Sequence, residues 1–114
     1  MLCLPDICAR RAGPDWLEVD LRVDADGAWF DGHFPGHPIV PGVVQIGWAA
    51  HFARDLLGGS EPPAQLERVK FRQPVGPDAE LTLSLHRVNA KVRWQFTARD
   101  GGAVSSGVLG VLDA

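Results

Sequence analysis

The chain lacks the features that mark a membrane, secreted or nucleic-acid-binding protein. No run of apolar residues approaches the roughly 20 that a transmembrane helix needs. The basic pair Arg10-Arg11 follows a short mixed stretch instead of preceding a long apolar one, so residues 1–13 do not resemble an export signal. Eleven basic residues stand against 14 acidic ones, whereas binding to nucleic-acid phosphates favours a basic balance. We therefore expect a cytoplasmic protein with no membrane span and no nucleic-acid partner.

Cysteine is also scarce. Cys3 and Cys8 are the only two, and the chain has no CxxC pair. This predicts two reduced thiols, with neither a disulfide framework nor a zinc site. The sequence also has no GxGxxG, so we expect no metal and no redox cofactor. With 114 residues and no repeat or linker, residues 1–114 are predicted to form one domain.

Glycine and proline, 13 and 9 residues, divide the chain into short elements. Residues 28–30 are predicted to begin a short strand, and residues 31–42 form a loop too rich in Gly and Pro for regular structure. Five longer stretches are predicted as strands, several from a clear alternation of apolar and polar residues: Trp16–Val23, Leu66–Arg72, Glu80–His86, Lys91–Thr97 and Ala103–Leu112.

One long helix is predicted over Val43–Leu57, between Pro41 and the Gly58-Gly59 pair. Apolar residues cover nearly every side of it, which predicts a helix buried all round. The element order predicts an α+β fold in which a curved antiparallel sheet wraps one buried helix. Such a sheet leaves a long edge strand that invites pairing with a second copy.

Two motifs and the alternating strand pair that ends in Ala103–Leu112 carry a resemblance to a known family. Residues 32–43 read GHFPGHPIVPGV, close to the GHFPxxPxxPGV signature of the 3-hydroxyacyl-acyl-carrier-protein dehydratases. Residues 69–78 read VKFRQPVGPD, similar to the KFRxPVxPGD strand and turn of the same enzymes. The chain therefore resembles the hotdog fold and its dehydratase branch over roughly residues 16–112. That resemblance implies dehydration of a 3-hydroxyacyl thioester to the trans-2-enoyl thioester.

The chain also departs from the standard fatty-acid dehydratases. Their longer N-terminal segment is largely absent, and their helix Glu or Asp, fourteen residues after the catalytic His, is replaced by Gly47. The shorter start and the VQxxW pattern of residues 44–48 are more similar to the aryl-polyene-cluster (ApeI-like) dehydratases.

The residues offer candidates for each chemical role. Dehydration needs a base, a donor for the leaving hydroxyl, and a donor for the enolate-like thioester oxygen. His33 is the candidate base. By the resemblance, the backbone N–H of Gly42 at the helix start is the oxyanion donor. His51 lies one turn after Gly47 on the same helix face and is the candidate acid, directly or through a water; a structural histidine is the alternative.

The remaining candidates bind substrate or partners. Pro41, Val43 and Gly47 are expected at the substrate, and Gln45 to orient His33 or a water, unless it only meets solvent. Phe30, Phe34, Trp48 and Phe71 are expected to line an acyl tunnel, with simple core packing as the alternative. Arg68, Lys70, Arg72 and Arg93 form an expected basic rim for a phosphopantetheine arm or an acidic carrier protein, with solvated strand faces as the alternative.

The resemblance implies a homodimer with active sites at its interface, His33 of one subunit facing the helix of the other. A heteromer with a second hotdog protein is a further possibility. Two alternative functions stay open. A thioesterase would use an acidic helix residue, and Asp55 is the only helix carboxylate. A non-catalytic partner subunit would explain Gly47, although such a subunit has no need of His33.

Overall fold

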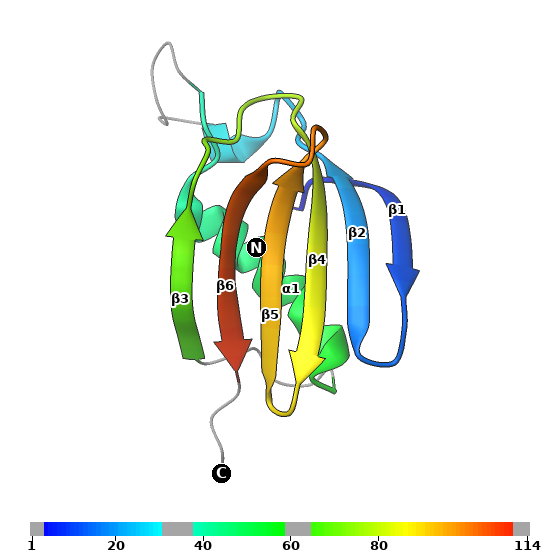
Figure 1. The fold of residues 1–114 in the computed structure, drawn as a ribbon. Coiled ribbons are helices and arrows are strands. Elements are labelled where there is room, and N and C mark those ends of the chain that lie inside the picture. Colours follow the sequence, from blue (N-terminus) through cyan, green and yellow to red (C-terminus); the bar gives the residue numbers. More distant parts are fainter. Residues whose placement is uncertain (1–3, 31–37, 59–64, 111–114) are drawn as a thin grey trace.

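The computed structural model describes residues 4–30, 38–58 and 65–110. One α-helix packs against a six-stranded antiparallel sheet, which confirms the predicted α+β arrangement (Figure 1). The strands are β1 (Asp6–Ala12), β2 (Trp16–Arg22), β3 (Gln65–Phe71), β4 (Glu80–Val88), β5 (Lys91–Ala98) and β6 (Ala103–Gly110), and the helices are η1 (Ala28–Phe30) and α1 (Gly42–Leu56).

The strand order in the sheet is β1-β2-β4-β5-β6-β3, with every neighbouring pair antiparallel. Strands β1 and β3 are therefore the two edges. Figure 1 shows α1 crossing behind the sheet, from the β3 edge toward the far end of β4. The helix begins behind an edge strand, and this places the start of α1 beside β3.

The alternating strands predicted from the sequence have one buried and one exposed face. In β2, β4 and β5 every second residue is buried on the side of α1, where apolar area leaves water. The helix contributes Trp48 and Phe52, both almost fully buried. The inward strand residues of this core are Leu17, Val19, Leu21, Leu81, Leu83, Leu85, Val92, Trp94 and Phe96.

Two predictions about the first third of the chain were wrong. Ala28–Phe30 is a 3₁₀ turn, not a strand, because a bend at Asp24–Gly27 leads directly into it and buries Trp29 against Trp48, with ring centroids 5.2 Å apart. The strand β1 was not predicted at all. Its residues are exposed, except for half-buried Ala9, so the sequence carries no alternation there, and only backbone pairing with β2 defines it.

The helix was predicted within one residue at each end, but not its burial. Only one side of α1 is buried, through Gln45, Trp48, Ala49, Phe52 and Ala53. The opposite side includes Val43, whose side chain is 74% exposed. Val43 is thus open in the single chain, whereas Val44, Ile46 and Ala50 are half-buried.

Strand β3 contains a β-bulge. Leu66 pairs with Leu109 and Phe71 with Ser105, so five steps along β3 match four along β6. Arg68, within the bulge, has a φ of 54°, a left-handed conformation that is uncommon outside glycine. The extra residue places both Leu66 and Phe71 on the α1 side of the sheet.

Candidate active site

The candidate base lies outside the described residues. His33 and Phe34 fall within residues 31–37, so their roles stay predictions. The structure describes the chain again from Pro38, through Val40 and Pro41 into α1. The site is therefore built from the start of the helix and the strands next to it.

The start of α1 presents backbone donors beside an aromatic ring. The first intrahelical bonds run from the N–H groups of Val44 and Gln45 to the Pro41 carbonyl, at 3.0 and 3.3 Å. The N–H groups of Gly42 and Val43 precede this ladder, at the positive end of the helix dipole. A Cβ on Gly42 would lie 2.6 Å from Cζ of Phe71, so the ring packs directly on this glycine. Such donors suit the binding of a carbonyl oxygen that gains negative charge.

The side chain of Gln45 forms hydrogen bonds that hold the segment before α1 against the sheet. Its side chain is 3% exposed, and Ser105 Oγ of β6 donates a hydrogen bond to its Oε1 at 2.7 Å. Its Nε2 donates to the Val40 carbonyl at 3.4 Å, and the Val40 N–H donates to the Val75 carbonyl at 2.8 Å. Gln45 thus does not meet solvent, and Val40 is held on two sides.

The aromatic residues expected to line a tunnel lie in different surroundings. Trp48 is fully buried, edge-on to Trp29 and to Phe96, which is the core packing weighed as the alternative. Phe30 lies next to Trp29, with ring centroids 6.3 Å apart. Phe71 alone of these is half exposed, over Gly42. The described residues therefore bring one of the expected tunnel residues, Phe71, to the helix start.

Gly47 and His51 share the side of α1 that faces away from the sheet. They are one turn apart, and neither belongs to the buried set of the helix. The His51 ring is exposed and stands edge-on to Phe52, with centroids 5.1 Å apart. Gly47 itself is half-buried, whereas His51 is exposed to a molecule or subunit that approaches this side.

Asp55, on which the thioesterase alternative depends, is occupied elsewhere. Its carboxylate pairs with Arg10 of β1 at 2.7 Å, near the C-terminal end of α1. That end lies a whole helix away from Gly42. The structure therefore does not bring Asp55 to the helix start.

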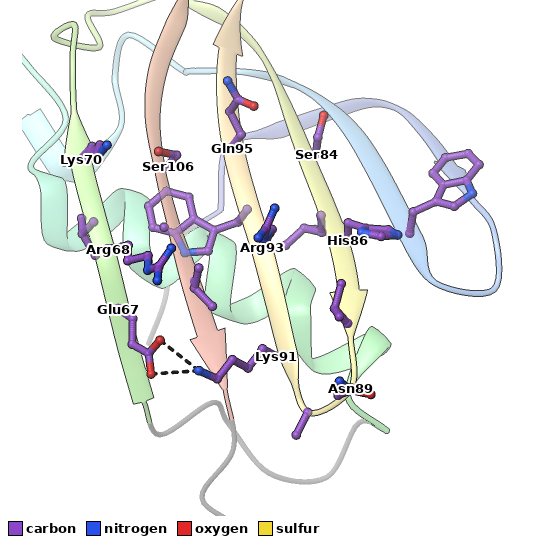
Figure 2. Close-up of a pocket in the computed structure, with 18 of the residues that line it drawn as sticks. Glu67, Arg68, Lys70, Ser84, His86, Asn89, Lys91, Arg93, Gln95 and Ser106 are labelled. Carbon is purple, nitrogen blue, oxygen red and sulfur yellow. Dashed lines mark hydrogen bonds and ion pairs between the residues drawn. The ribbon is translucent and has the colours of Figure 1, made fainter.

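The outer face of the sheet, opposite α1, is hollowed and basic. Figure 2 shows side chains of β3, β4, β5 and β6 standing off this face around a hollow of about 1130 Å³. All four residues of the expected basic rim line it: Arg68, Lys70, Arg72 and Arg93. The prediction that these cations gather on one surface is confirmed, and what binds there is a separate question.

Ion pairs hold β1 to β2 at the other edge. Arg11 hydrogen-bonds Glu18 at 3.1 Å and both carboxylate oxygens of Asp20 at 3.0 Å. The Arg11 guanidinium, helped by the Thr82 hydroxyl, lowers the pKa of Asp20, and the same bonds raise the pKa of Arg11. These charges neutralise one another within the fold.

No group of three or more His, Cys, Asp or Glu side chains lies together as a metal site in the described residues. The expected absence of a metal and of a cofactor stays a prediction. Within the same ranges, no helix is long and apolar enough to cross a bilayer.

Sequence reasoning missed Ser105 as the partner of Gln45. The residues are 60 positions apart, so no local pattern links them. One weak signal was present. Ser105 lies four residues before Leu109, and in a regular strand these two side chains point to the same face. A polar side chain was therefore expected on the buried face, where it needs a hydrogen-bond partner.

The sequence matches the ApeI-like dehydratase family over residues 9–108. It is 31% identical over 103 residues to the 3-hydroxyacyl-[acyl-carrier-protein] dehydratase FabZ of Haemophilus influenzae, covering 83% of this chain and 68% of that protein. It is also 31% identical over 85 residues to FabZ of Gluconobacter oxydans, covering 66% of this chain and half of that enzyme. The match to the bifunctional LpxC/FabZ enzyme of Porphyromonas gingivalis spans 18% of that longer protein.

Solved structures agree with the sequence match. A chain of the dehydratase heterocomplex ApeI:P from Xenorhabdus doucetiae superposes with a TM-score of 0.87 and 28% identity, over 95% of this chain and 97% of that one. The dehydratase domain of the polyketide protein PpsC from Mycobacterium tuberculosis shares the fold at 17% identity and a TM-score of 0.78, over 98% of this chain and 46% of that one. These neighbours confirm the hotdog fold expected from the motifs. The chain belongs to the ApeI-like dehydratase family.

Proposed function

We propose that this protein removes water from a 3-hydroxyacyl thioester carried on an acyl carrier protein, giving the trans-2-enoyl thioester in fatty-acid-like or aryl-polyene synthesis. The observation that carries the proposal is the start of α1, where Gly42 offers its N–H beside Phe71. Membership of the ApeI-like dehydratase family and the similarity to FabZ enzymes support the reaction class.

The reaction needs three coordinated groups. His33 takes the proton from C2 of the substrate, and the electron pair moves into the thioester as its carbonyl oxygen gains negative charge. The Gly42 N–H stabilises that oxygen, aided by the helix dipole. The C2–C3 double bond then forms as the C3–O bond breaks, and the hydroxyl leaves as water with a proton from an acid.

His51 is the candidate for that acid. The carboxylate position of the standard enzymes is Gly47, and His51 lies one turn later on the same open side of α1. A water held next to Gly47 would place a proton between His51 and the leaving hydroxyl. Pro41 and Val43 flank the oxyanion donor, so substrate atoms that reach Gly42 pass them.

Gln45 has a positioning role in this scheme. It holds Val40, two residues before Gly42, against Ser105 of the sheet. This fixes the direction in which the chain enters α1, and with it the Gly42 N–H. Trp48, buried in the core, supports the same helix.

The site is completed by a second subunit. Val43, Leu66 and Phe71 are 74%, 45% and 50% exposed, and Leu66 and Phe71 lie on the α1 side of the edge strand β3. Apolar surface next to a free strand edge favours pairing with another chain. The second subunit is a second copy or another hotdog protein, and the ApeI:P heterocomplex supports the latter arrangement. His33 of one subunit then faces His51 of the other. The expected cytoplasmic location stays a prediction.

The test is a direct turnover assay with 3-hydroxyacyl-carrier-protein substrates, alkyl and aryl in parallel, read by product mass. Loss of 18 mass units, the mass of water, is expected from the wild type and not from His33→Ala. Release of the free acid would instead identify a thioesterase. Substrate that binds but stays unchanged would point to a non-catalytic partner subunit, and a complete hotdog partner added to the assay would then restore turnover.

A further inference from the structure

The outer face of the sheet gathers positive charge that the fold itself does not use. All eleven Lys and Arg residues of the chain lie within the described ranges. Most pair with a carboxylate or a carbonyl, as Lys91 does with Glu67 at 3.1 Å. Arg68, Lys70, Arg72 and Arg93 make no ion pair or side-chain hydrogen bond with any described residue, and all four line the outer hollow.

The two carboxylates at this hollow are already neutralised. Glu67 pairs with Lys91, and Glu18 pairs with Arg11 of the neighbouring edge. The hollow therefore carries a net positive charge on a protein whose total charge is −3. Uncompensated like charges gathered on one face repel each other, so this arrangement is stabilised by an anionic partner.

Backbone strain contributes to the same face. Arg68 has the left-handed φ of 54° within the bulge of β3, a conformation that is strained for a residue with a Cβ. Figure 2 shows its side chain extending from β3 over β6, on the same face as Arg93 of β5. A regular β3 would avoid this strain but would not carry the extra residue.

The shape of the face suits a protein more than a small molecule. The hollow is open and extends over five strands, which at about 4.8 Å per strand is roughly 19 Å, wider than one helix of about 10 Å. Ser84, Gln95 and Ser106 line the same face with uncharged polar side chains. Trp16, 39% exposed, is the first residue of β2, lines the hollow and offers an apolar contact.

The face also adjoins the candidate active site. Lys70 stands on the outer side of β3, whereas the next residue, Phe71, stands on the inner side and packs on Gly42. Only the thickness of one edge strand separates the cationic face from the oxyanion donor. A partner docked on the outer face reaches the helix start by a flexible arm that passes around β3.

We propose that the outer sheet face is the docking surface for a carboxylate-rich surface of the carrier protein that delivers the thioester. This rests on the proposed function. The charge complementarity argues against a second copy of the chain on the same face, since that would oppose one set of unpaired cations to another. The uncharged polar side chains and exposed Trp16 favour a protein surface over a nucleic-acid duplex.

The experiment measures binding apart from catalysis. Fluorescently labelled holo-acyl carrier protein, without an acyl chain, is titrated with the full chain by anisotropy at 50 and 500 mM salt. We expect Lys70→Glu and Arg93→Glu each to weaken binding about fivefold or more, and high salt to weaken wild-type binding, because both act on the same charges. The matched control is Arg99→Glu, the same charge change at the β5–β6 turn, where Arg99 pairs with Glu80. The control is expected to bind as the wild type does.

Kinetics provide the second readout. With a carrier-linked substrate, Lys70→Glu and Arg93→Glu should raise KM by a similar factor and leave kcat unchanged. With a pantetheine thioester that has no carrier protein, both constants should match the wild type.

Unchanged carrier binding in both variants, with melting temperatures near the wild type, would overturn the docking proposal even if dehydration is observed. Absence of dehydration with carrier binding that still depends on Lys70 and Arg93 would overturn the proposed function alone. Tighter binding of a DNA duplex, lost in the same variants, would also overturn the docking proposal.

Discussion

The buried pair of Gln45 and Ser105 yields a quantitative prediction about stability. Gln45→Leu keeps the side-chain volume but leaves Ser105 Oγ and the Val40 carbonyl without their amide partner in an apolar interior. A buried group that loses its partner costs about 1–3 kcal/mol. The 2.7 Å bond to Ser105 is short and the 3.4 Å bond to Val40 is long, so most of this cost lies on the Ser105 side. We expect Gln45→Leu to lower the free energy of unfolding by about 2 kcal/mol.

The double variant separates this pair from ordinary packing. Ser105→Ala alone should cost about 1.5 kcal/mol, because it strands the Gln45 oxygen. Gln45→Leu with Ser105→Ala removes both partners, so it should be no less stable than Gln45→Leu alone, giving a coupling free energy of at least about 1.5 kcal/mol. Urea denaturation measures these values, and melting should shift by about 4 °C for each kcal/mol at this chain length.

Turnover distinguishes a positioning role from a structural one. The double variant recovers stability relative to the sum of the singles, yet Val40 still lacks the Gln45 Nε2 donor. We therefore expect kcat to be lowered in Gln45→Leu and equally low in the double variant, although the added Ser105→Ala costs no further stability. Additive effects of the two substitutions on unfolding would refute the argument that the two side chains are coupled. A kcat close to the wild-type value in Gln45→Leu or in the double variant would refute the positioning role of Gln45.

Three further predictions concern separate parts of the structure. Gly42→Ala should cost about 1 kcal/mol of stability, since its Cβ meets the Phe71 ring at 2.6 Å, and Phe71→Ala in the same chain should remove that penalty in urea denaturation. His51→Ala should lower kcat on the order of 10²-fold while His86→Ala, an exposed histidine of β4, does not; equal kcat for His51→Ala and wild type would exclude this acid. Asp20→Asn should lower the melting temperature slightly at pH 7, since the Asp20 pKa is lowered by Arg11. That stabilisation is present above the unfolded-state pKa of about 3.9 and is lost as pH falls through the lower folded-state pKa, so the difference from wild type should shrink below about pH 4.

The strands that could be predicted are those with two different faces. In β2, β4 and β5 the alternation is a direct consequence of one side packing on α1 and the other facing water. Strand β1 lacks this difference, because almost all of its residues are exposed, and it exists through backbone pairing that no composition reveals. The same reasoning failed at Ala28–Phe30, where three apolar residues form a turn that inserts Trp29 into the core.

The part of the candidate site that depends on local sequence could be predicted. The part that depends on contacts between residues far apart in the chain could not. Pro41 and Gly42 are local signals for the first turn of a helix, and α1 begins there. The burial of Gln45 depends on Ser105, which arrives from β6 through the whole sheet topology. The exposure of Val43 could not be predicted locally either. An apolar helix residue is predicted to be buried, and the sequence does not say whether its own chain or another chain buries it.

The bulge in β3 has a consequence for comparing this chain with its relatives. Because Leu66 and Phe71 share a face although they are five residues apart, an odd number, inside and outside exchange once within the strand. A relative with a regular β3 can be aligned residue for residue only by placing a one-residue gap near Arg68. If the gap is omitted, every position on one side of the bulge is matched to a residue of the opposite face. Phe71 would then be equated with a solvent-facing residue and Lys70 with an inward one. Deleting Val69 from this chain would remove the extra residue, and a regular β3 would then keep Leu66 and Phe71 on the same face, four positions apart.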